Sequence, residues 1–325
     1  MGYFQQGGQW RLRSIEICAG AGGQALGLEQ AGFEPLALVE TDADACATLR
    51  LNRPGWNVLE GDLREFDASE LADVDLLAGG VPCPPFTVAG KQLGSKDNRD
   101  LFPEAMRLVS ECLPRAVMLE NVPGLLQQKF DRYRRMVVIR LEAMGYSCFW
   151  DVARASRFSV PQLRPRSVLI ALRHPPARFF TWPEGSDSPP PQVGPVLFSE
   201  MASLGWAGAR KWAEEARGVA PTLVGGSKKH GGADLGPTRA KSAWEKLGVD
   251  GKGVADEPPG KNFVGKPRLT VKMAALVQGF PPEWTFVGKK TSAYRQVGNA
   301  FPPPLARAMG EAVRKALEAG ELSGA

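Results

Sequence analysis

The sequence predicts an α/β fold, a doubly wound and mostly parallel sheet with a second, smaller and loop-rich lobe. Short apolar segments alternate with helical segments up to residue 172, and Pro and Gly then crowd the chain until order returns at Arg268. Strands that are buried on both faces of a parallel sheet read as nearly continuous apolar runs, with crossover helices between them. We therefore expect one domain over 1–172, a second lobe over 173–266, and a C-terminal segment over 267–325 that returns to the first domain.

Six short apolar segments, rich in Val, Ile and Leu and bounded by turn residues or helical sequence, indicate strands. They lie at residues 13–19, 35–40, 57–62, 74–80, 116–122 and 167–172. Between and after them, apolar residues recur at helical spacing. The expected helices lie at 25–32, 42–51, 101–112, 133–144, 271–280 and 305–317.

The segment 173–266 contains runs such as S-P-P-P-Q-V-G-P and shows no regular alternation of helix and strand. A disordered linker would explain this composition. The same segment holds Trp182, Trp206, Trp212 and Trp244, which a solvated linker does not need. We therefore expect a small, loop-rich second lobe.

Composition indicates a soluble globular protein, with 43% hydrophobic and 23% charged residues among 325. No apolar run approaches the roughly 20 residues that span a bilayer, and the start of the chain lacks the apolar core of a signal peptide, so we expect a cytoplasmic protein without a membrane segment. Five scattered cysteines favour reduced thiols over a disulfide framework or a zinc site, and we expect no metal. The net charge of +5 is compatible with a polyanionic partner.

Three successive strand ends suggest one ligand pocket. The turn A-G-A-G-G at 19–23 follows a strand and opens a helix, and its glycines allow a ligand to approach the backbone closely. Glu40 ends the next strand, about 20 residues on, where an acid can accept hydrogen bonds from both ribose hydroxyls. Asp62 ends the third strand and could accept from an adenine amino group. Because the full G-x-G-x-x-G spacing is missing, a nucleoside with a non-phosphate tail fits better than a dinucleotide.

A cysteine stands among prolines in V-P-C-P-P-F-T, directly after the strand at 74–80. Proline cannot donate to a sheet ladder, so the strand stops there and Cys83 lies on a stiff loop at the ligand-binding edge. A thiol in that place is a candidate nucleophile. Glu120 ends the following strand, which could be a neighbour. Arg164 and Arg166, two apart in Q-L-R-P-R, would point the same way on an extended chain.

In this order, these motifs resemble those of the cytosine-C5 DNA methyltransferase family of bacterial restriction–modification systems, over nearly the whole chain. E-I-C-A-G-A-G-G looks like the S-adenosylmethionine turn, P-C-P-P-F-T like the nucleophile loop, and E-N-V and Q-L-R-P-R like two further motifs. R-L-T-V-K-M-A-A-L-V-Q-G-F-P and Y-R-Q-V-G-N-A-F-P are similar to the ninth and tenth motifs. Four residues depart from the common pattern: Cys18, Thr41, Pro84 and Thr87.

The resemblance implies a Rossmann-like fold and a DNA (cytosine-5-)-methyltransferase that flips a cytosine out of duplex DNA. Cys83 would add to C6, Glu120 would bind and protonate N3, and Arg164 and Arg166 would hold O2 and the loop or phosphates. S-adenosyl-L-methionine would donate the methyl group and become S-adenosyl-L-homocysteine. Its implied contacts are Cys18, Ala19, Gly20, Gly22, Gly23, Glu40, Thr41, Asp62, Leu63, Gly80, Pro82, Leu101, Asn299 and Ala300.

The resemblance also implies a target-recognition region over 173–266, in which Thr222 and Leu223 look like the family's Thr-Leu pair. The expected DNA contacts are Lys91, Arg99, Thr222, Leu223, Lys228, Lys229, Arg239 and Lys241. A cognate restriction endonuclease could act on the same sequence without stable contact, and we expect a monomer. Two alternatives stay open: an RNA (tRNA) cytosine-C5 methyltransferase, and a DNA-binding protein that has lost the reaction.

Overall fold

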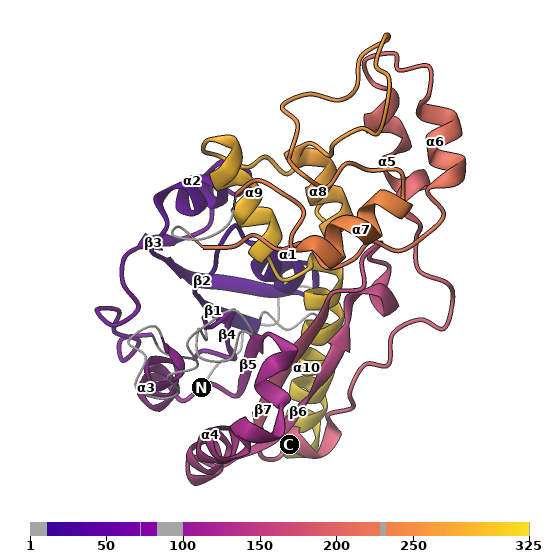
Figure 1. Ribbon diagram of the computed structural model, residues 1–325. Helices are drawn as coiled ribbons and strands as arrows, with labels where there is room; N and C mark the ends of the chain where they lie inside the picture. The colour runs from indigo at the N-terminus through magenta and orange to yellow at the C-terminus, as the bar shows by residue number, and fades with distance from the viewer. Residues whose placement is uncertain (1–11, 72, 83–99, 228–231, 325) are drawn as a thin grey trace.

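A single mixed sheet forms the centre of the molecule (Figure 1). The structure, a computed structural model, describes residues 12–71, 73–82, 100–227 and 232–324. Within these ranges seven strands lie in the order β3-β2-β1-β4-β5-β7-β6. They are β1 (Leu12–Ile17), β2 (Phe33–Glu40), β3 (Val58–Glu60), β4 (Leu76–Gly79), β5 (Ala116–Asn121), β6 (Tyr146–Arg154) and β7 (Pro165–Arg173).

The predicted α/β fold with a mostly parallel sheet is confirmed. The first five strands pair in parallel, and β7 runs antiparallel to both β5 and β6. The sequence analysis missed β6, which is an edge strand with a mostly half-buried pattern. Such a strand carries fewer apolar residues than the buried strands, so its sequence resembles a loop.

Helices cover both faces of the sheet. They are α1 (Gly23–Gln30), α2 (Ala43–Asn52), α3 (Phe102–Cys112), α4 (Asp131–Ala143), α5 (Val193–Ala202), α6 (Ala209–Glu215), α7 (Thr238–Lys246), α8 (Val271–Gln278), α9 (Lys290–Asn299) and α10 (Pro303–Gly324). One face packs against α3 and α4, where Val117 and Leu119 of β5 meet Val109 and Leu141. The other packs against α1 and α10, and this arrangement makes the sheet doubly wound.

The side chains of β5 alternate between the two faces of the sheet, so this strand packs against the helices on both sides. Val117 and Leu119 face α3 and α4, whereas Ala116 and Met118 belong to the cluster under α1 and α10. Side chains alternate between the two faces of a strand, so Glu120 follows Met118 toward the α10 side. The carboxylate of Glu120 therefore lies at the C-terminal end of β5, on the face of the sheet that α10 covers.

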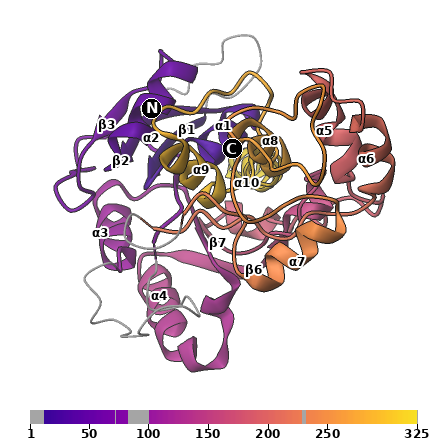
Figure 2. The same cartoon turned by 45° about the horizontal axis from the view of Figure 1, so that its top comes forward.

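The segment 173–266 contains α5, α6 and α7, which the sequence analysis did not identify because Pro and Gly crowd around them. These helices lie together, well apart from α3 and α4 (Figure 2). Their buried residues, among them Leu197, Trp212 and Trp244, form one cluster with Tyr294 of α9 and Leu26 of α1. Because this cluster runs on into α1, α8 and α9, a separate second domain stays a prediction. No helix in the described ranges has the length and apolar character needed to cross a membrane.

Candidate active site

The turn between β1 and α1 is shaped by glycine. Gly20 and Gly22 have φ of 54° and 85°, a region that favours glycine. A β-carbon on Gly22 would lie 2.6 Å from a methyl carbon of Leu49, and one on Gly23 would lie 2.3 Å from the carbonyl oxygen of Phe301. A β-carbon on Gly20, by contrast, would meet no atom of the described residues within 4 Å. The turn is thus closed on its protein side and open at Gly20.

Cys18 and Ala19 form the start of the same turn. Cys18 has φ of 52°, a strained conformation for a residue with a side chain. Burial raises the pKa of its thiol, and the nearby carboxylates of Glu40 and Asp62 raise it further. The Cys18 thiol is therefore held in the neutral form, as a contact surface rather than a nucleophile.

Glu40 ties this turn to the end of β2. Its Oε2 accepts from the backbone N–H of Gly20 at 2.7 Å, and its Oε1 accepts from Thr41 and Asp42 at 2.8 Å each. A carboxylate offers about four lone-pair positions. The hydroxyl of Thr41 also donates to Oε1 at 3.4 Å, so the room for a ligand hydroxyl is at Oε2, and Thr41 itself is exposed.

Asp62 lies next to Glu40, because the N–H of Gly61 donates to the carbonyl of Glu40 at 3.0 Å. The carboxylate of Asp62 accepts from the backbone N–H of Arg64 at 2.9 Å and pairs with its guanidinium at 3.0 Å. The backbone hydrogen bond, followed by the charge of Arg64, lowers the pKa of Asp62. Within the described part of the chain, a β-carbon on Gly61 would meet nothing within 4 Å, so this side is also open. Leu63, by contrast, is buried.

The ends of β4 and β5 bring a carboxylate close to the chain that leads to the cysteine loop. The two strands are neighbours, as expected, with Gly79 opposite Leu119. A β-carbon on Gly80 would lie 3.4 Å from Oε2 of Glu120. Pro82, two residues on, is exposed. Cys83 itself lies outside the described residues, as do Pro84, Thr87, Lys91 and Arg99.

Asn121 fixes the same strand end, and the sequence analysis did not single it out. Its Nδ2 donates to the carbonyl of Val81 at 2.9 Å, and its Oδ1 accepts from the N–H of Val122 at 2.8 Å. Both Asn121 and Val81 are buried. The amide therefore holds the backbone two residues before Cys83. An amide directly after Glu120 in E-N-V was the available signal for this role.

Glu120 and Arg166 form a buried ion pair. Arg166 Nε lies 2.6 Å from Glu120 Oε1, and the two side chains are 10% and 11% exposed. Burial raises the pKa of Glu120, although the charges of Arg166 and Arg164 oppose this. Burial likewise lowers the pKa of Arg166, and Glu120 opposes that shift. Burial thus favours the protonated carboxyl of Glu120, which is the form that can act as a general acid.

Arg164 lies deeper than Arg166, and its guanidinium donates to three backbone carbonyls. These carbonyls belong to Leu223, Gly298 and Ala300. Leu223 is buried, so its side chain packs in the core, whereas Thr222 is half-buried. Arg164 as a group that holds the base or a phosphate stays a prediction.

The remaining predicted residues are spread around this centre. Leu101 precedes the first residue of α3 and is half-buried. Asn299 is exposed at the end of α9, next to half-buried Ala300. Arg239 on α7 is exposed, and Lys241 pairs with Asp234 at 2.8 Å. Lys228 and Lys229 lie outside the described residues.

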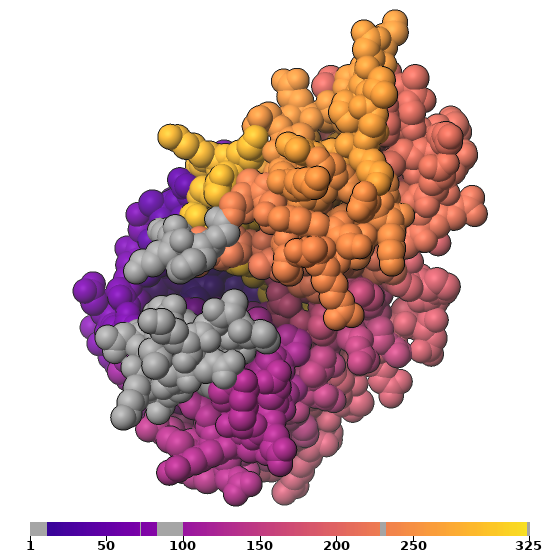
Figure 3. Space-filling view, viewed as in Figure 1, coloured from indigo at the N-terminus to yellow at the C-terminus, as the bar shows by residue number. Residues whose placement is uncertain are grey.

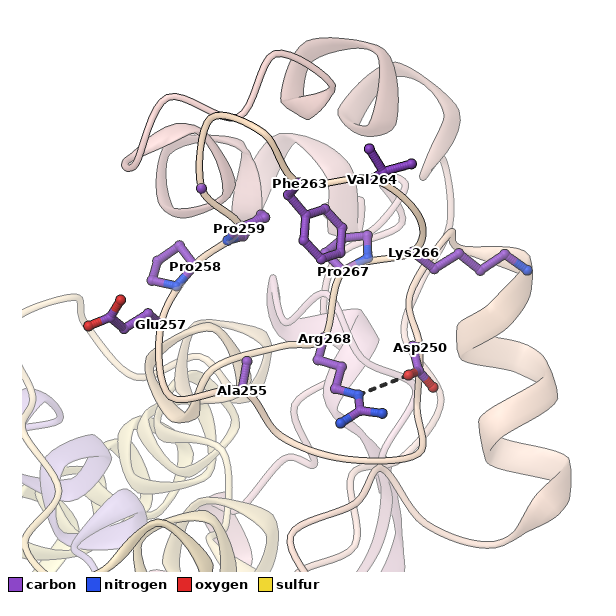
Figure 4. A pocket seen from close by; sticks show the side chains of 11 residues that line it. Asp250, Ala255, Glu257, Pro258, Pro259, Phe263, Val264, Lys266, Pro267 and Arg268 are labelled. Atoms are coloured by element: carbon purple, nitrogen blue, oxygen red, sulfur yellow. Dashed lines mark hydrogen bonds and ion pairs between the residues drawn. The ribbon is translucent and has the colours of Figure 1, made fainter.

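The surface is hollowed between the orange segment that includes α7 and the purple and magenta segments below it, with the indigo N-terminal part at its floor (Figure 3). A separate cavity lies within 250–268 and contains none of the predicted site residues. In Figure 4, the ion pair of Arg268 and Asp250, at 2.8 Å, lies below the ring of Phe263. The strand ends, rather than this cavity, therefore hold the candidate chemistry.

Comparison with protein families identifies the chain. The model of the C-5 cytosine-specific DNA methylase family matches residues 12–315. The chain belongs to this family. The resemblance found in the sequence is thereby confirmed.

Curated relatives match almost the whole length of the methylase. The methylase is 56% identical over 312 residues to the type II methyltransferase M.NaeI of Lentzea aerocolonigenes, and the match covers 94% of this chain and 75% of that protein. It is 51% identical over 311 residues to M.NgoMIV of Neisseria gonorrhoeae, covering 95% and 99%. Solved structures share the fold at low identity. The Entamoeba histolytica methyltransferase EhMeth has a TM-score of 0.66 at 14% identity, covering 95% of this chain and 99% of that one.

Proposed function

We propose that the methylase transfers a methyl group from S-adenosylmethionine to C5 of a cytosine flipped out of double-stranded DNA, with Cys83 as the nucleophile. The observation that carries the proposal is the buried pair of Glu120 and Arg166. It lies beside Gly80, where the chain leads into the cysteine loop. A base held there would meet an acid, a guanidinium and a thiol from three adjoining segments.

The residues of the first three strand ends fit the methyl donor. The open space at Gly20 and Gly61 adjoins Glu40, whose Oε2 has a lone-pair position left for a ribose hydroxyl. The half-buried Cys18 and the exposed Thr41 would line the adenosine. When bound, S-adenosylmethionine supplies an electrophilic methyl group on a sulfonium sulfur.

The chain's own groups would make cytosine reactive. Addition of the Cys83 thiolate to C6 breaks the aromaticity of the ring, and the electron pair moves to C5. The carboxyl of Glu120 gives a proton to N3 as negative charge grows there, and Arg166 stabilises the same charge near O2. C5 then takes the methyl group. Loss of the C5 proton to a base and departure of the thiolate restore the aromatic ring.

This chemistry requires the base to leave the helix. C6 cannot be attacked from within a stacked duplex, and flipping costs a few kcal/mol of pairing and stacking. The cationic residues Lys91, Arg99, Lys228, Lys229, Arg239 and Lys241 would contact DNA, mainly its phosphates, and the segment 173–266 would read the sequence. We infer a cytoplasmic monomer that protects DNA from a cognate restriction endonuclease.

Transfer of a labelled methyl group from S-adenosylmethionine tests the reaction. We expect transfer to duplex DNA and none to tRNA; transfer to tRNA alone would make the chain an RNA methyltransferase. Bisulfite sequencing of DNA from cells expressing the chain would give both the modified base and its sequence context. Binding to DNA without any methyl transfer would instead indicate a protein that has lost the reaction.

A covalent trap tests the role of Cys83. Duplex DNA that carries 5-fluorocytosine cannot lose the C5 substituent, so we expect a stable complex with the wild-type protein. Cys83→Ser should form no such complex and no methylated product, while still binding S-adenosylhomocysteine. Trapping by the serine variant, or undiminished turnover in it, would overturn the assignment.

A further inference from the structure

Two turns that are far apart in the sequence touch backbone to backbone. One is the turn at 222–226, which contains the Thr-Leu pair, and the other follows α9 at 298–300. A β-carbon on Gly298 would lie 2.4 Å from the backbone nitrogen of Gly225. A β-carbon on Gly225 would lie 2.4 Å from the carbonyl oxygen of Arg295 and 2.6 Å from Oδ1 of Asn299. No side chain fits between the turns, so neither can shift without moving the other.

Arg164 holds both turns at once. Its Nη1 donates to the carbonyl of Leu223 at 2.9 Å. Its Nη2 donates to the carbonyl of Gly298 at 2.9 Å and to that of Ala300 at 2.6 Å. The side chain is completely buried, and the residue itself has φ of 22°, which is uncommon for a non-glycine residue. Such strain persists where the surroundings over-determine a conformation.

Gln162 adds a second attachment to the same turn. Its Oε1 accepts from the N–H of Leu223 at 2.8 Å, so both backbone polar groups of Leu223 are held by side chains of one short segment. The Nε2 of Gln162 donates to Oε1 of Gln278, whose own Nε2 donates to the carbonyl of Ala300. Gln162 and Gln278 are completely buried. The network thus closes a ring through both turns.

The network also reaches the candidate active site. Arg164 is two residues from Arg166, and its charge acts on the buried carboxyl of Glu120. Burial lowers the pKa of Arg164, yet the pKa of arginine is ordinarily so high that the guanidinium stays charged. A planar guanidinium can serve several carbonyls in fixed directions, whereas the ammonium of lysine is a compact point charge. Lysine at position 164 would therefore not hold both turns.

We propose that Arg164 is a positioning residue that locks the turn at 222–226 to the turn at 298–300, so that DNA and the methyl donor strengthen each other's binding. The inference rests on the proposed function and on contacts that the family resemblance implies, those of Thr222 with DNA and of Asn299 and Ala300 with the cofactor. A ligand that orders one turn orders the other through Arg164, and the second ligand then binds a prepared site. Coupling of this kind is reciprocal.

A binding square measures the coupling. The Kd of S-adenosylhomocysteine is measured with and without a duplex that contains the target site, and the Kd of the duplex with and without S-adenosylhomocysteine. In the wild type both ratios should agree and lie in the range of about 5 to 150. In Arg164→Lys the ratio of the two Kd values should fall to about 2 or less, because the side chain no longer connects the two turns.

Arg115→Lys is the matched control. Arg115 is also a partly buried guanidinium, which pairs with Asp75 at 3.0 Å and donates to the carbonyl of Leu317 at 3.2 Å. It precedes β5, at the opposite strand end from Glu120. This variant should lose stability but keep the wild-type coupling ratio. An unchanged ratio in Arg164→Lys, an equal loss in Arg115→Lys, or a wild-type ratio of one would each overturn the proposal.

Asn299→Ala covers the case in which Arg164→Lys does not fold. Asn299 is exposed, and its Nδ2 donates across the two turns to the carbonyl of Gly226 at 3.2 Å. Its loss should leave the fold intact and lower the coupling ratio by a factor of about 2 to 5. A ratio equal to that of the wild type would contradict the proposal. Failure of the proposed function would show differently, as a wild-type protein that does not methylate duplex DNA.

Discussion

Glu120 and Arg166 meet as a buried pair, Oε1 to Nε at 2.6 Å, although they reach the site from strands that run in opposite directions. Glu120 lies near the end of β5, and Arg166 near the start of β7. Two ions taken out of water require each other, because the loss of one leaves the other buried and unpaired. The pair is therefore a unit in both stability and chemistry.

Glu120→Gln should lower kcat for methyl transfer by about 10² to 10⁴, the usual contribution of a positioned acid or base. The amide keeps the shape of the side chain but cannot give up a proton to N3. Steady-state kinetics with duplex DNA would measure the loss. Glu104→Gln is the control, since Glu104 pairs with Arg107 on α3 at 2.8 Å, and it should retain the wild-type kcat. Equal kcat in the two variants would remove Glu120 from the reaction.

Asn121→Ala should lower kcat and also reduce stability by about 1 to 3 kcal/mol, because the buried carbonyl of Val81 loses its donor. The backbone ahead of Cys83 would then lose its attachment to β5. Asn57→Ala removes an equivalent amide-to-carbonyl bond, to Leu36 at 2.9 Å, from an exposed position. That variant should keep full kcat. If Asn121→Ala also kept full kcat, its amide would have no part in placing the loop.

Glu16→Gln should stabilise the protein, and increasingly so as the pH rises. Burial raises the pKa of Glu16 well above its ordinary value of 4.5, and Oε2 has no partner among the described residues. Between 4.5 and the raised value the folded chain binds more protons than the unfolded chain, so the wild type loses stability as the pH increases through this window. Glutamine removes that loss. Urea unfolding at several pH values between 4 and 9 would measure it, and a difference that does not depend on pH would contradict the raised pKa.

Leu113→Gly should stabilise the protein by about 0.5 to 1 kcal/mol. Leu113 ends α3 with φ of 42°, a left-handed conformation that costs a residue with a β-carbon about 1 to 2 kcal/mol. Glycine relieves this strain, although it gains freedom in the unfolded state. Leu113→Ala keeps the β-carbon and should give no such gain. Urea unfolding of both variants separates the two cases, and equal stabilities would refute the explanation.

Local patterns were sufficient to predict much of the fold. The buried strands are apolar runs in the sequence. The tight turn before α1 was predicted from Gly20, Gly22 and Gly23. Strand β6 was missed because most of its residues are only half-buried, so its sequence is not a continuous apolar run. The helices of 173–266 were missed because their flanking prolines and glycines dominate the pattern. In both cases the stabilising contacts come from distant parts of the chain. The periodicity of a local segment carries no information about such contacts.

The same limit applies to Arg164. Q-L-R-P-R predicts two cations that point the same way, and the structure gives them different partners. Arg166 meets Glu120, whereas Arg164 reaches carbonyls 59 and 134 residues further along the chain, at Leu223 and Gly298. Partners at such separations depend on how the C-terminal segment folds back, so no local reading could assign them. The position of Cys83 stays a prediction, since it lies outside the described residues.

The reversed direction of β7 has a consequence for how Arg166 is placed. The parallel strands β1, β2, β4 and β5 present their predicted site residues where the chain leaves the sheet, and a helix follows each of them before the next strand. The arginine of β7 arrives from outside, after a short connection from β6 within the same hairpin. A positive charge and a negative one can thus be placed face to face without another helix. The placement of Arg166 therefore depends on the register of the β6–β7 hairpin, in which Arg166 lies opposite Ala153, rather than on the length of a crossover connection.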